Sequence, residues 1–258
     1  MKLTVVAWWL AASLTAGLAL PVSAQRRGEV LVSAASSLTE VMQRIAAAYQ
    51  ARTGTRVVLN LGASNTLARQ IAAGAPVDLF ISADAAQMEA VRTEIVAATR
   101  VDLLTNQLAV AVPADRPRPV RSARDLADPA FKRIALGDPV AVPAGVYARQ
   151  YLQRAGVWPL IEPKVIPSGS VRLALSAVES GAADAAIVYR TDVGAARGAR
   201  LAFVVPADDA PRIAYPAAVI RSAPHAAAAA QFLTFLRGRE AAEIFRRAGF
   251  GALSAIGD

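Results

Sequence analysis

Residues 29–49 read EVLVSAASSLTEVMQRIAAAY and join an apolar strand to an amphipathic helix through small and hydroxyl residues. Glu29 to Ser33 has the short apolar run of a buried strand. Apolar residues then recur at helical spacing: Leu38, Val41, Met42, Ile45 and Tyr49. Ser36 or Ser37 is expected to cap this helix with its side chain. A strand that leads directly into a helix is the repeating unit of α/β folds.

The same unit recurs along the rest of the chain. Further strands are expected at residues 56–61, 77–82, 103–112, 134–136, 164–167, 185–189, 201–205 and 213–220. Helices are expected after Asp84 and after the pair Ser122/Asp125, and also over residues 64–73, 143–156, 170–181 and 224–248. This alternation predicts an α/β fold with parallel sheets.

The N-terminal segment has the pattern of a secretory signal peptide. Lys2 is the only charged residue before Arg26, the run Leu3–Leu20 is almost continuously apolar, and Val22–Ala24 supplies small residues for cleavage. An N-terminal membrane anchor is the alternative, but a span needs about 20 apolar residues and this run reaches that length only by including glycine and proline. We expect residues 1–24 to be removed on export.

The composition of the 258-residue chain excludes many enzyme chemistries. It contains no cysteine and a single histidine, His225. Without cysteine there is no thiol nucleophile, iron–sulfur cluster or disulfide framework, and one histidine cannot form a two-histidine zinc site. The chain also has no cysteine to carry a lipid, so we expect a free periplasmic protein, not a lipoprotein, and one that is not an enzyme.

The charge balance is basic but dispersed. The chain has 28 Lys and Arg against 20 Asp and Glu, a net charge of +8. The arginines are scattered, with pairs only at Arg26–Arg27 and Arg246–Arg247. Nucleic-acid surfaces cluster their basic residues. We therefore expect no nucleic-acid partner, and a surface that mildly favours anions.

Four strand-to-helix turns combine small and hydroxyl residues with a helix start. They are Ala35–Leu38, Gly62–Thr66, Val142–Gly145 and Ser168–Arg172. Helix N-termini present unpaired N–H groups beyond the carboxyl ends of strands, where anions bind in α/β folds. Ordinary N-capping remains the alternative at each turn taken singly. Two turns fall in each half of the chain, as a cleft between two domains requires.

These turns belong to a longer series of motifs. The series is Ala34–Thr39, Ala63–Ile71, Gly74–Asp84, Gly137–Pro139, Val142–Ala148, Val171–Leu175, Ile187–Asp192 and Ala241–Phe250. In this order, and over nearly all of the chain after residue 24, it resembles the periplasmic molybdate-binding proteins of ABC importers. Together the motifs are highly specific.

The resemblance implies a two-lobed periplasmic binding protein fold of the type II-like kind. Each lobe would be a mostly parallel sheet flanked by helices, and the chain would cross twice between lobes, near Asn106 and Tyr215. Residues 25–106 and 216–258 would form lobe I, and residues 107–215 lobe II.

The resemblance also implies the anion ligands, which would be Ser37, Ser64, Ala144, Val171 and Tyr189. The two serines would each donate a hydroxyl and a backbone N–H group. Ala144 and Val171 would donate backbone N–H groups only, and Tyr189 its phenol hydroxyl. All contacts would reach the oxygens of molybdate, so no protein atom would ligate the metal directly.

The implied function is the capture of molybdate or tungstate by a monomer without a cofactor, for delivery to a membrane permease. None of the implied ligands is acidic, so no carboxylate would accept the proton of hydrogen phosphate, and phosphate should be rejected. Asp138 is expected to serve the turn before Pro139. Arg69 and Arg172 are expected to lie on helix surfaces.

Three alternatives remain. A binding protein of the same class could be specific for sulfate, chromate or another tetrahedral oxyanion. The same fold serves as the sensor domain of transcription regulators, although the signal peptide and the lack of a helix-turn-helix segment oppose this reading. An exported hydrolase or transferase is the third, and it lacks a nucleophile-elbow motif and a histidine near the four turns.

Overall fold

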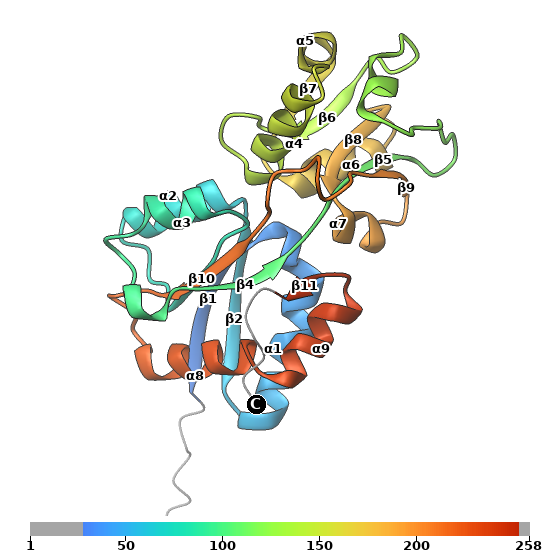
Figure 1. Ribbon diagram of the computed structural model, residues 1–258. Helices are drawn as coiled ribbons and strands as arrows, with labels where there is room; N and C mark the ends of the chain where they lie inside the picture. The colour runs from blue at the N-terminus through green and yellow to red at the C-terminus, as the bar shows by residue number, and fades with distance from the viewer. Residues whose placement is uncertain (1–27, 253–258) are drawn as a thin grey trace, which may run out of the picture.

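The computed structural model describes residues 28–252, which form two lobes, each built on its own β-sheet (Figure 1). The predicted signal peptide and cleavage site lie outside the described residues. No helix among residues 28–252 is long and apolar enough to cross a membrane.

Lobe I contains a six-stranded sheet in the order β11-β4-β10-β3-β1-β2. Its strands are β1 (Glu29–Ala35), β2 (Arg56–Gly62), β3 (Leu79–Ile81), β4 (Val101–Thr105), β10 (Tyr215–Val219) and β11 (Gly251–Ala252). Its helices are α1 (Thr39–Thr53), α2 (Ser64–Ala72), α3 (Ala85–Ala90), α8 (Ala226–Leu236) and α9 (Arg239–Arg247). Short 3-10 turns lie at η1 (Ser36–Leu38) and η2 (Ala97–Thr99).

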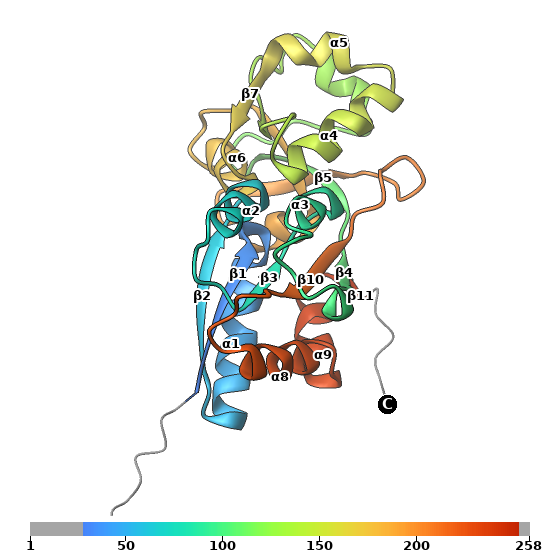
Figure 2. The same cartoon turned by 90° about the vertical axis from the view of Figure 1, so that its left-hand side faces the viewer.

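The helices of lobe I cover both faces of its sheet (Figure 2). Successive side chains of a strand point to opposite faces, and β3 shows the division. Leu79 and Ile81 belong to the core that includes residues of α1 and α8, whereas Phe80 packs in a separate cluster with Leu67 of α2 and Met88 of α3. The all-apolar sequence of β3 therefore reflects burial on two sides.

Lobe II contains a five-stranded sheet in the order β7-β6-β8-β5-β9. Its strands are β5 (Leu108–Pro113), β6 (Ile134–Gly137), β7 (Val165–Ser168), β8 (Ala185–Tyr189) and β9 (Ala199–Val204). Its helices are α4 (Pro143–Arg154), α5 (Trp158–Ile161), α6 (Val171–Glu179) and α7 (Arg190–Ala195), with 3-10 turns η3 (Ala123–Ala127) and η4 (Glu162–Lys164).

Both sheets are mixed, so the expectation of mostly parallel sheets describes only part of each. In lobe I, β1 pairs in parallel with β2 and β3, while β10 pairs antiparallel with β3 and β4, and β11 with β4. In lobe II, β6 pairs in parallel with β7 and β8, while β5 pairs antiparallel with β8 and β9. The antiparallel pairs involve the strands next to the crossings, which enter each sheet from the other lobe.

The apolar segment 103–112, expected as one strand, is two strands in different sheets. β4 ends at Thr105 and β5 begins at Leu108. At the break, the Asn106 Oδ1 atom accepts a hydrogen bond of 2.9 Å from the Gln107 backbone N–H. A local bond of this kind competes with sheet pairing. The chain changes lobes here, and again between β9 and β10 (Figure 1).

The C-terminal helical region, expected as one stretch over residues 224–248, is broken into α8 and α9. Gly238 lies between them and is the N-cap of α9, with an extended backbone. Other boundaries follow the sequence signals: Gly54 ends α1 in the left-handed conformation at φ 74°, and Asp84 caps α3 by accepting the Gln87 N–H at 2.8 Å.

Candidate functional site

A very small cavity lies where the two lobes meet. Its walls come from the ends of β1 and β2 in lobe I and from α4, α6 and β8 in lobe II. The lining residues are Ala35, Ser36, Ser37, Gly62, Ala63, Ser64, Ala83, Val142, Pro143, Ala144, Val171 and Tyr189. All five residues carried over from the resemblance are therefore brought together, although they are spread over more than 150 positions of the chain.

The cavity wall contains no charged side chain. Instead, η1, α2, α4 and α6 all begin at it. The first N–H groups of a helix have no partner within the helix, and the helix dipole places a positive partial charge at this end. The cavity can therefore hold an anion without a counter-ion of its own.

Ser37 is the buried serine of the first turn, with 3% of its surface exposed. Its Oγ atom lies 3.1 Å from the phenol oxygen of Tyr215. The expectation that Ser36 or Ser37 caps the helix with its side chain is wrong, because no side-chain capping bond forms at η1 or α1. Both serines lie within η1, before Leu38, which is the N-cap of α1. The Ser36 carbonyl accepts a hydrogen bond from the Thr39 hydroxyl at 2.7 Å.

Ser64 is the first residue of α2 and is 1% exposed. Its Oγ atom accepts a hydrogen bond of 2.9 Å from the backbone N–H of Ala83. An N–H group can only donate, so the Ser64 hydroxyl keeps its own proton for a ligand. Ala83 also lines the cavity.

The start of α4 depends on Gly145. Pro143 occupies the first turn, where its missing N–H has no helical partner to lose. A Cβ atom on Gly145 would lie 1.9 Å from the Gly137 carbonyl oxygen, so only glycine lets α4 approach the end of β6 this closely. This approach places Ala144 in the cavity wall. Asp138 serves the turn as predicted, accepting the Val140 N–H at 2.8 Å.

Val171 is the first residue of α6 and is buried. The residue before it, Ser170, caps the helix by accepting the Leu173 N–H at 3.2 Å. The Val171 side chain packs in the core that both lobes share. An apolar residue can therefore occupy a binding position when only its backbone N–H faces the ligand.

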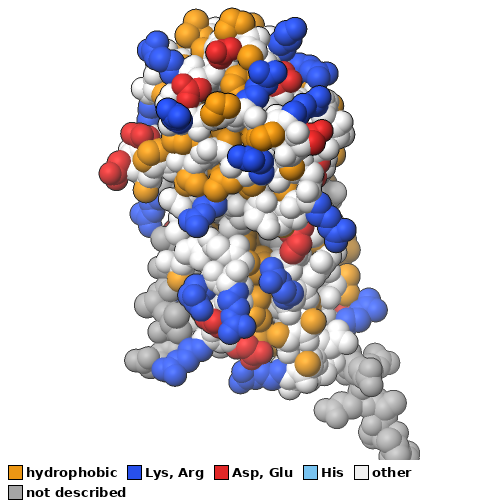
Figure 3. All heavy atoms as spheres, turned by 90° about the vertical axis from the view of Figure 1, so that its right-hand side faces the viewer, with side chains coloured by type: hydrophobic (Ala, Val, Ile, Leu, Met, Phe, Trp, Pro, Cys, Tyr) orange, Lys and Arg blue, Asp and Glu red, His pale blue; other side chains and the backbone are white. Residues whose placement is uncertain are grey.

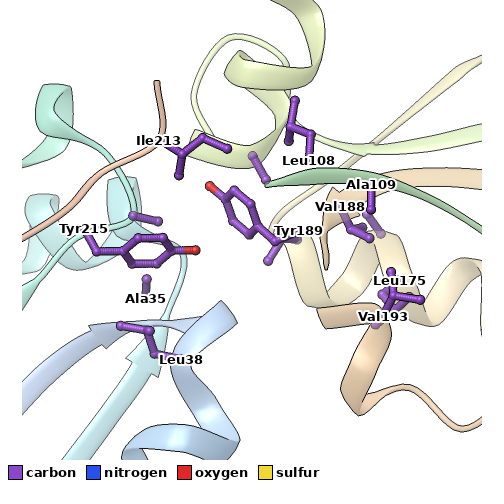
Figure 4. Close-up of a cluster of buried hydrophobic side chains, with 14 of the residues drawn as sticks. Ala35, Leu38, Leu108, Ala109, Leu175, Val188, Tyr189, Val193, Ile213 and Tyr215 are labelled. Atoms are coloured by element: carbon purple, nitrogen blue, oxygen red, sulfur yellow. The ribbon is translucent and has the colours of Figure 1, made fainter. Parts of the chain in front are cut away.

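Tyr189 ends β8 with a fully buried phenol. Its hydroxyl has no hydrogen-bond partner among the described residues. Buried polar groups without a partner are rare and call for an explanation, such as a missing ligand. Burial raises the pKa of Tyr189 well above its ordinary value, with the nearby Tyr215 adding to the effect, so the hydroxyl remains a donor. Figure 4 shows the two rings side by side at the junction of the lobes.

Arg172 is not a helix-surface residue, contrary to expectation. Its side chain is only 22% exposed and forms an ion pair with Glu40 of α1 in the other lobe. Its Nε atom lies 3.3 Å from the Ser36 carbonyl oxygen and 3.0 Å from the Asp192 carboxylate. Arg69, by contrast, is exposed on α2, as predicted, and donates to the Thr66 hydroxyl of the same helix.

Asp192 is the buried partner of Arg172. Burial raises the pKa of its carboxyl to about 7, and the positive charge of Arg172 acts in the opposite direction. Asp192 also accepts the Tyr189 backbone N–H at 3.2 Å. This carboxyl therefore connects the end of β8, where Tyr189 enters the cavity, to the arginine that contacts lobe I.

The fold and the cavity together define a class of protein. Two lobes joined by two crossings enclose a small neutral cavity lined with N–H and O–H donors, which is the construction of a solute-binding protein for a small anion. The chain belongs to the family of bacterial extracellular solute-binding proteins, whose family model matches residues 30–251.

Named relatives and solved structures agree with this assignment. The chain is 41% identical over 229 residues to the molybdate-binding protein ModA of Escherichia coli, covering 86% of this chain and 89% of the relative. It is 30% identical to ModA of Haemophilus influenzae, covering 93% and 96%. The periplasmic molybdate-binding protein of Azotobacter vinelandii superposes with a TM-score of 0.79 at 26% identity, covering 86% of this chain and 98% of that one.

Proposed function

We propose that this protein captures molybdate, and also tungstate, in the interlobe cavity and delivers it to the membrane permease of an ABC importer. It would do so as a periplasmic monomer, exported by cleavage after residue 24, without catalysing a reaction and without a cofactor. The main observation in support of this proposal is that all five implied ligands line one cavity.

The donors of the cavity suit a fully deprotonated tetrahedral anion. Ser64 accepts a hydrogen bond from a backbone N–H, and Tyr189 has a phenol with a raised pKa and no other partner among the described residues, so both hydroxyls have a proton to donate. Neither position carries a carboxylate that would accept the proton of a protonated ligand. Hydrogen phosphate would bring an O–H group against these donors and leave it unsatisfied, which costs about 1–3 kcal/mol or more.

Sulfate carries no proton at neutral pH, so protonation cannot exclude it. Selection against sulfate would rest on the size of the cavity, because molybdate and tungstate have longer metal–oxygen bonds. The same argument predicts little discrimination between molybdate and tungstate. Sulfate or chromate binding is the alternative function within this class.

Ligand binding would favour closure of the lobes. Ser37 and Ser64 belong to lobe I, whereas Ala144, Val171 and Tyr189 belong to lobe II. An anion in contact with both sets binds the closed arrangement more tightly than an open one, and this difference in affinity is what shifts the equilibrium.

Calorimetric titration of the mature protein in phosphate-free buffer tests the proposal, with molybdate, tungstate, sulfate and phosphate added in turn. We expect one-to-one binding of molybdate and tungstate and no heat from phosphate. If sulfate bound as tightly as molybdate or more tightly, the assigned substrate would be wrong but the binding site would stand. Absence of binding by all four anions would refute the proposal.

A further inference from the structure

We propose that Tyr215 and Asn106 are positioning residues that force the Ser37 hydroxyl to donate its proton toward the bound anion. The inference rests on the proposed function and adds to it the residues that orient the hydroxyl of one binding residue, Ser37. Neither residue lines the cavity, and both act through Ser37.

The chain of hydrogen bonds begins at a group whose direction is fixed. The backbone N–H of Gln107 can only donate, and it lies 2.9 Å from Asn106 Oδ1. This contact identifies the oxygen of the Asn106 amide, so the NH2 group must point the other way. Asn106 Nδ2 lies 2.9 Å from the Thr191 hydroxyl and 3.2 Å from the Tyr215 hydroxyl.

The direction passes from Asn106 to Tyr215. An amide NH2 group has no acceptor capacity, so the Tyr215 oxygen receives the hydrogen bond and its own proton must go elsewhere. The other hydrogen-bond partner of this phenol in the structure is Ser37 Oγ, at 3.1 Å. Tyr215 is completely buried, and burial raises the pKa of its phenol, so the proton stays in place.

Ser37 is consequently an acceptor from Tyr215 and a donor toward the cavity. Ser64 reaches the same state by a different route, through the backbone N–H of Ala83. The two hydroxyls of lobe I thus present protons to the ligand. The direction at Ser64 is set by the main chain, whereas that at Ser37 is set by side chains and can be changed by substitution.

The two positioning residues lie where the chain changes lobes. Asn106 follows the last residue of β4, and Tyr215 is the first residue of β10. Asn106 also contacts Thr191 in α7 of lobe II. The hydrogen bonds therefore connect the two crossings to Thr191 of lobe II and to Ser37 of lobe I. The direction of the Ser37 hydroxyl is fixed when the lobes lie as they do in this structure.

A double-mutant cycle tests whether Tyr215 acts through Ser37. Molybdate affinity is measured for the wild type, Tyr215→Phe, Ser37→Ala and the double variant. We expect Tyr215→Phe to weaken binding about 5- to 30-fold in the wild-type background, less than the loss of a whole hydrogen bond to a charged group, because Ser37 keeps its hydroxyl and loses only its fixed direction. In the Ser37→Ala background the same substitution should change affinity less than about twofold, because the hydroxyl it directs is gone.

A matched control removes a buried phenol hydroxyl elsewhere. Tyr49 is buried in the lobe I core against Phe232 and Phe235, so Tyr49→Phe should leave affinity unchanged in both backgrounds. Thermal unfolding without ligand verifies that each variant folds. A purely structural role for Tyr215 would give equal losses of affinity in both backgrounds and would overturn the inference.

The outcomes separate this inference from the proposed function. If the wild type binds molybdate and Tyr215→Phe weakens binding equally in both backgrounds, the proposed function stands and the positioning role of Tyr215 is rejected. No wild-type binding of molybdate, tungstate, sulfate or phosphate rejects both, because Ser37 would then have no anion to serve. Loss of affinity in the wild-type background alone supports both.

Discussion

Replacing Arg172 by glutamine should weaken anion binding although Arg172 does not line the cavity. The side chain starts next to Val171, a proposed ligand, and reaches lobe I, where it contacts Glu40 and the Ser36 carbonyl. These contacts form between the lobes, so opening of the lobes would break them. The contact with Asp192 lies within lobe II, so a rigid-body opening would leave it in place.

The magnitude follows from the interlobe contacts alone. Glu40 is 45% exposed, so its pair with Arg172 is screened by solvent and is worth at most about 1 kcal/mol. The bond from the guanidinium to the Ser36 carbonyl is long at 3.3 Å, which places it at the low end of charge-assisted bonds, near 1.5 kcal/mol. A loss of about 2 kcal/mol corresponds to roughly thirtyfold weaker binding.

The assay is calorimetric titration with molybdate at low and high salt, with Arg69→Gln as the control. Arg69 is an exposed arginine of α2, and its hydrogen bond goes to Thr66 of the same helix. Small-angle scattering of the ligand-free protein should show Arg172→Gln more open than the wild type. An affinity within twofold of the wild type, or an equal loss in Arg69→Gln, would refute the interlobe role of Arg172.

Three further predictions concern the cavity and its supports. Ser64→Ala and Ser37→Ala should each weaken molybdate binding by about 1–3 kcal/mol in the same titration, and unchanged affinity in both would contradict the site assignment. Gly145→Ala should lower the thermal midpoint and weaken binding at least tenfold, because the added Cβ meets the main chain at Gly137; a variant as stable and as tight as the wild type would exclude this role. Burial raises the pKa of Asp192 from 3.8 to about 7, so the folded state holds an extra proton between these values and the contribution of Asp192 to stability falls as pH rises through this window. In Asp192→Asn, the free energy of unfolding measured from pH 4 to 8 should lose this pH dependence, which amounts to about 1.4 kcal/mol per unit of pKa shift. An unchanged slope would show that Asp192 does not titrate in this range.

Local features of the sequence were sufficient for most elements. The helix after residue 38 and strands such as β8 are visible in the order of apolar residues over a few neighbouring positions. Glycine ends to helices and the Asp84 cap are equally local. The five cavity residues came from the resemblance, since apolar residues such as Ala144 and Val171 contribute only backbone groups and carry no chemical signal of binding.

The features that were missed depend on contacts between distant segments. Which strands pair antiparallel is decided by where the chain crosses between lobes, and no periodicity records this. Arg172 looks like a surface residue from its place in α6, because Glu40 and Ser36 meet it only after the lobes come together. The hydrogen bond between Asn106 and Tyr215 was missed for the same reason, because the two residues are 109 positions apart. A long side chain in the first turn of a cavity-lining helix is a signal that could have identified Arg172.

Arg172 carries its charge outside the neutral cavity wall, and this separation affects how an anion can be bound and released. The face shown in Figure 3 carries Lys and Arg interspersed with Asp and Glu, yet the cavity wall is neutral. A buried arginine in the wall would need a counter-ion whenever the cavity was empty. Outside the wall, Arg172 has the Asp192 carboxyl of its own lobe as a partner. With the proposed ligands, opening would separate two sets of neutral donors, Ser37 and Ser64 on one side and Tyr189 with two backbone groups on the other, without exposing an unpaired charge in the cavity. Each lobe alone would then offer the anion about half of its contacts, so separation of the lobes would release it.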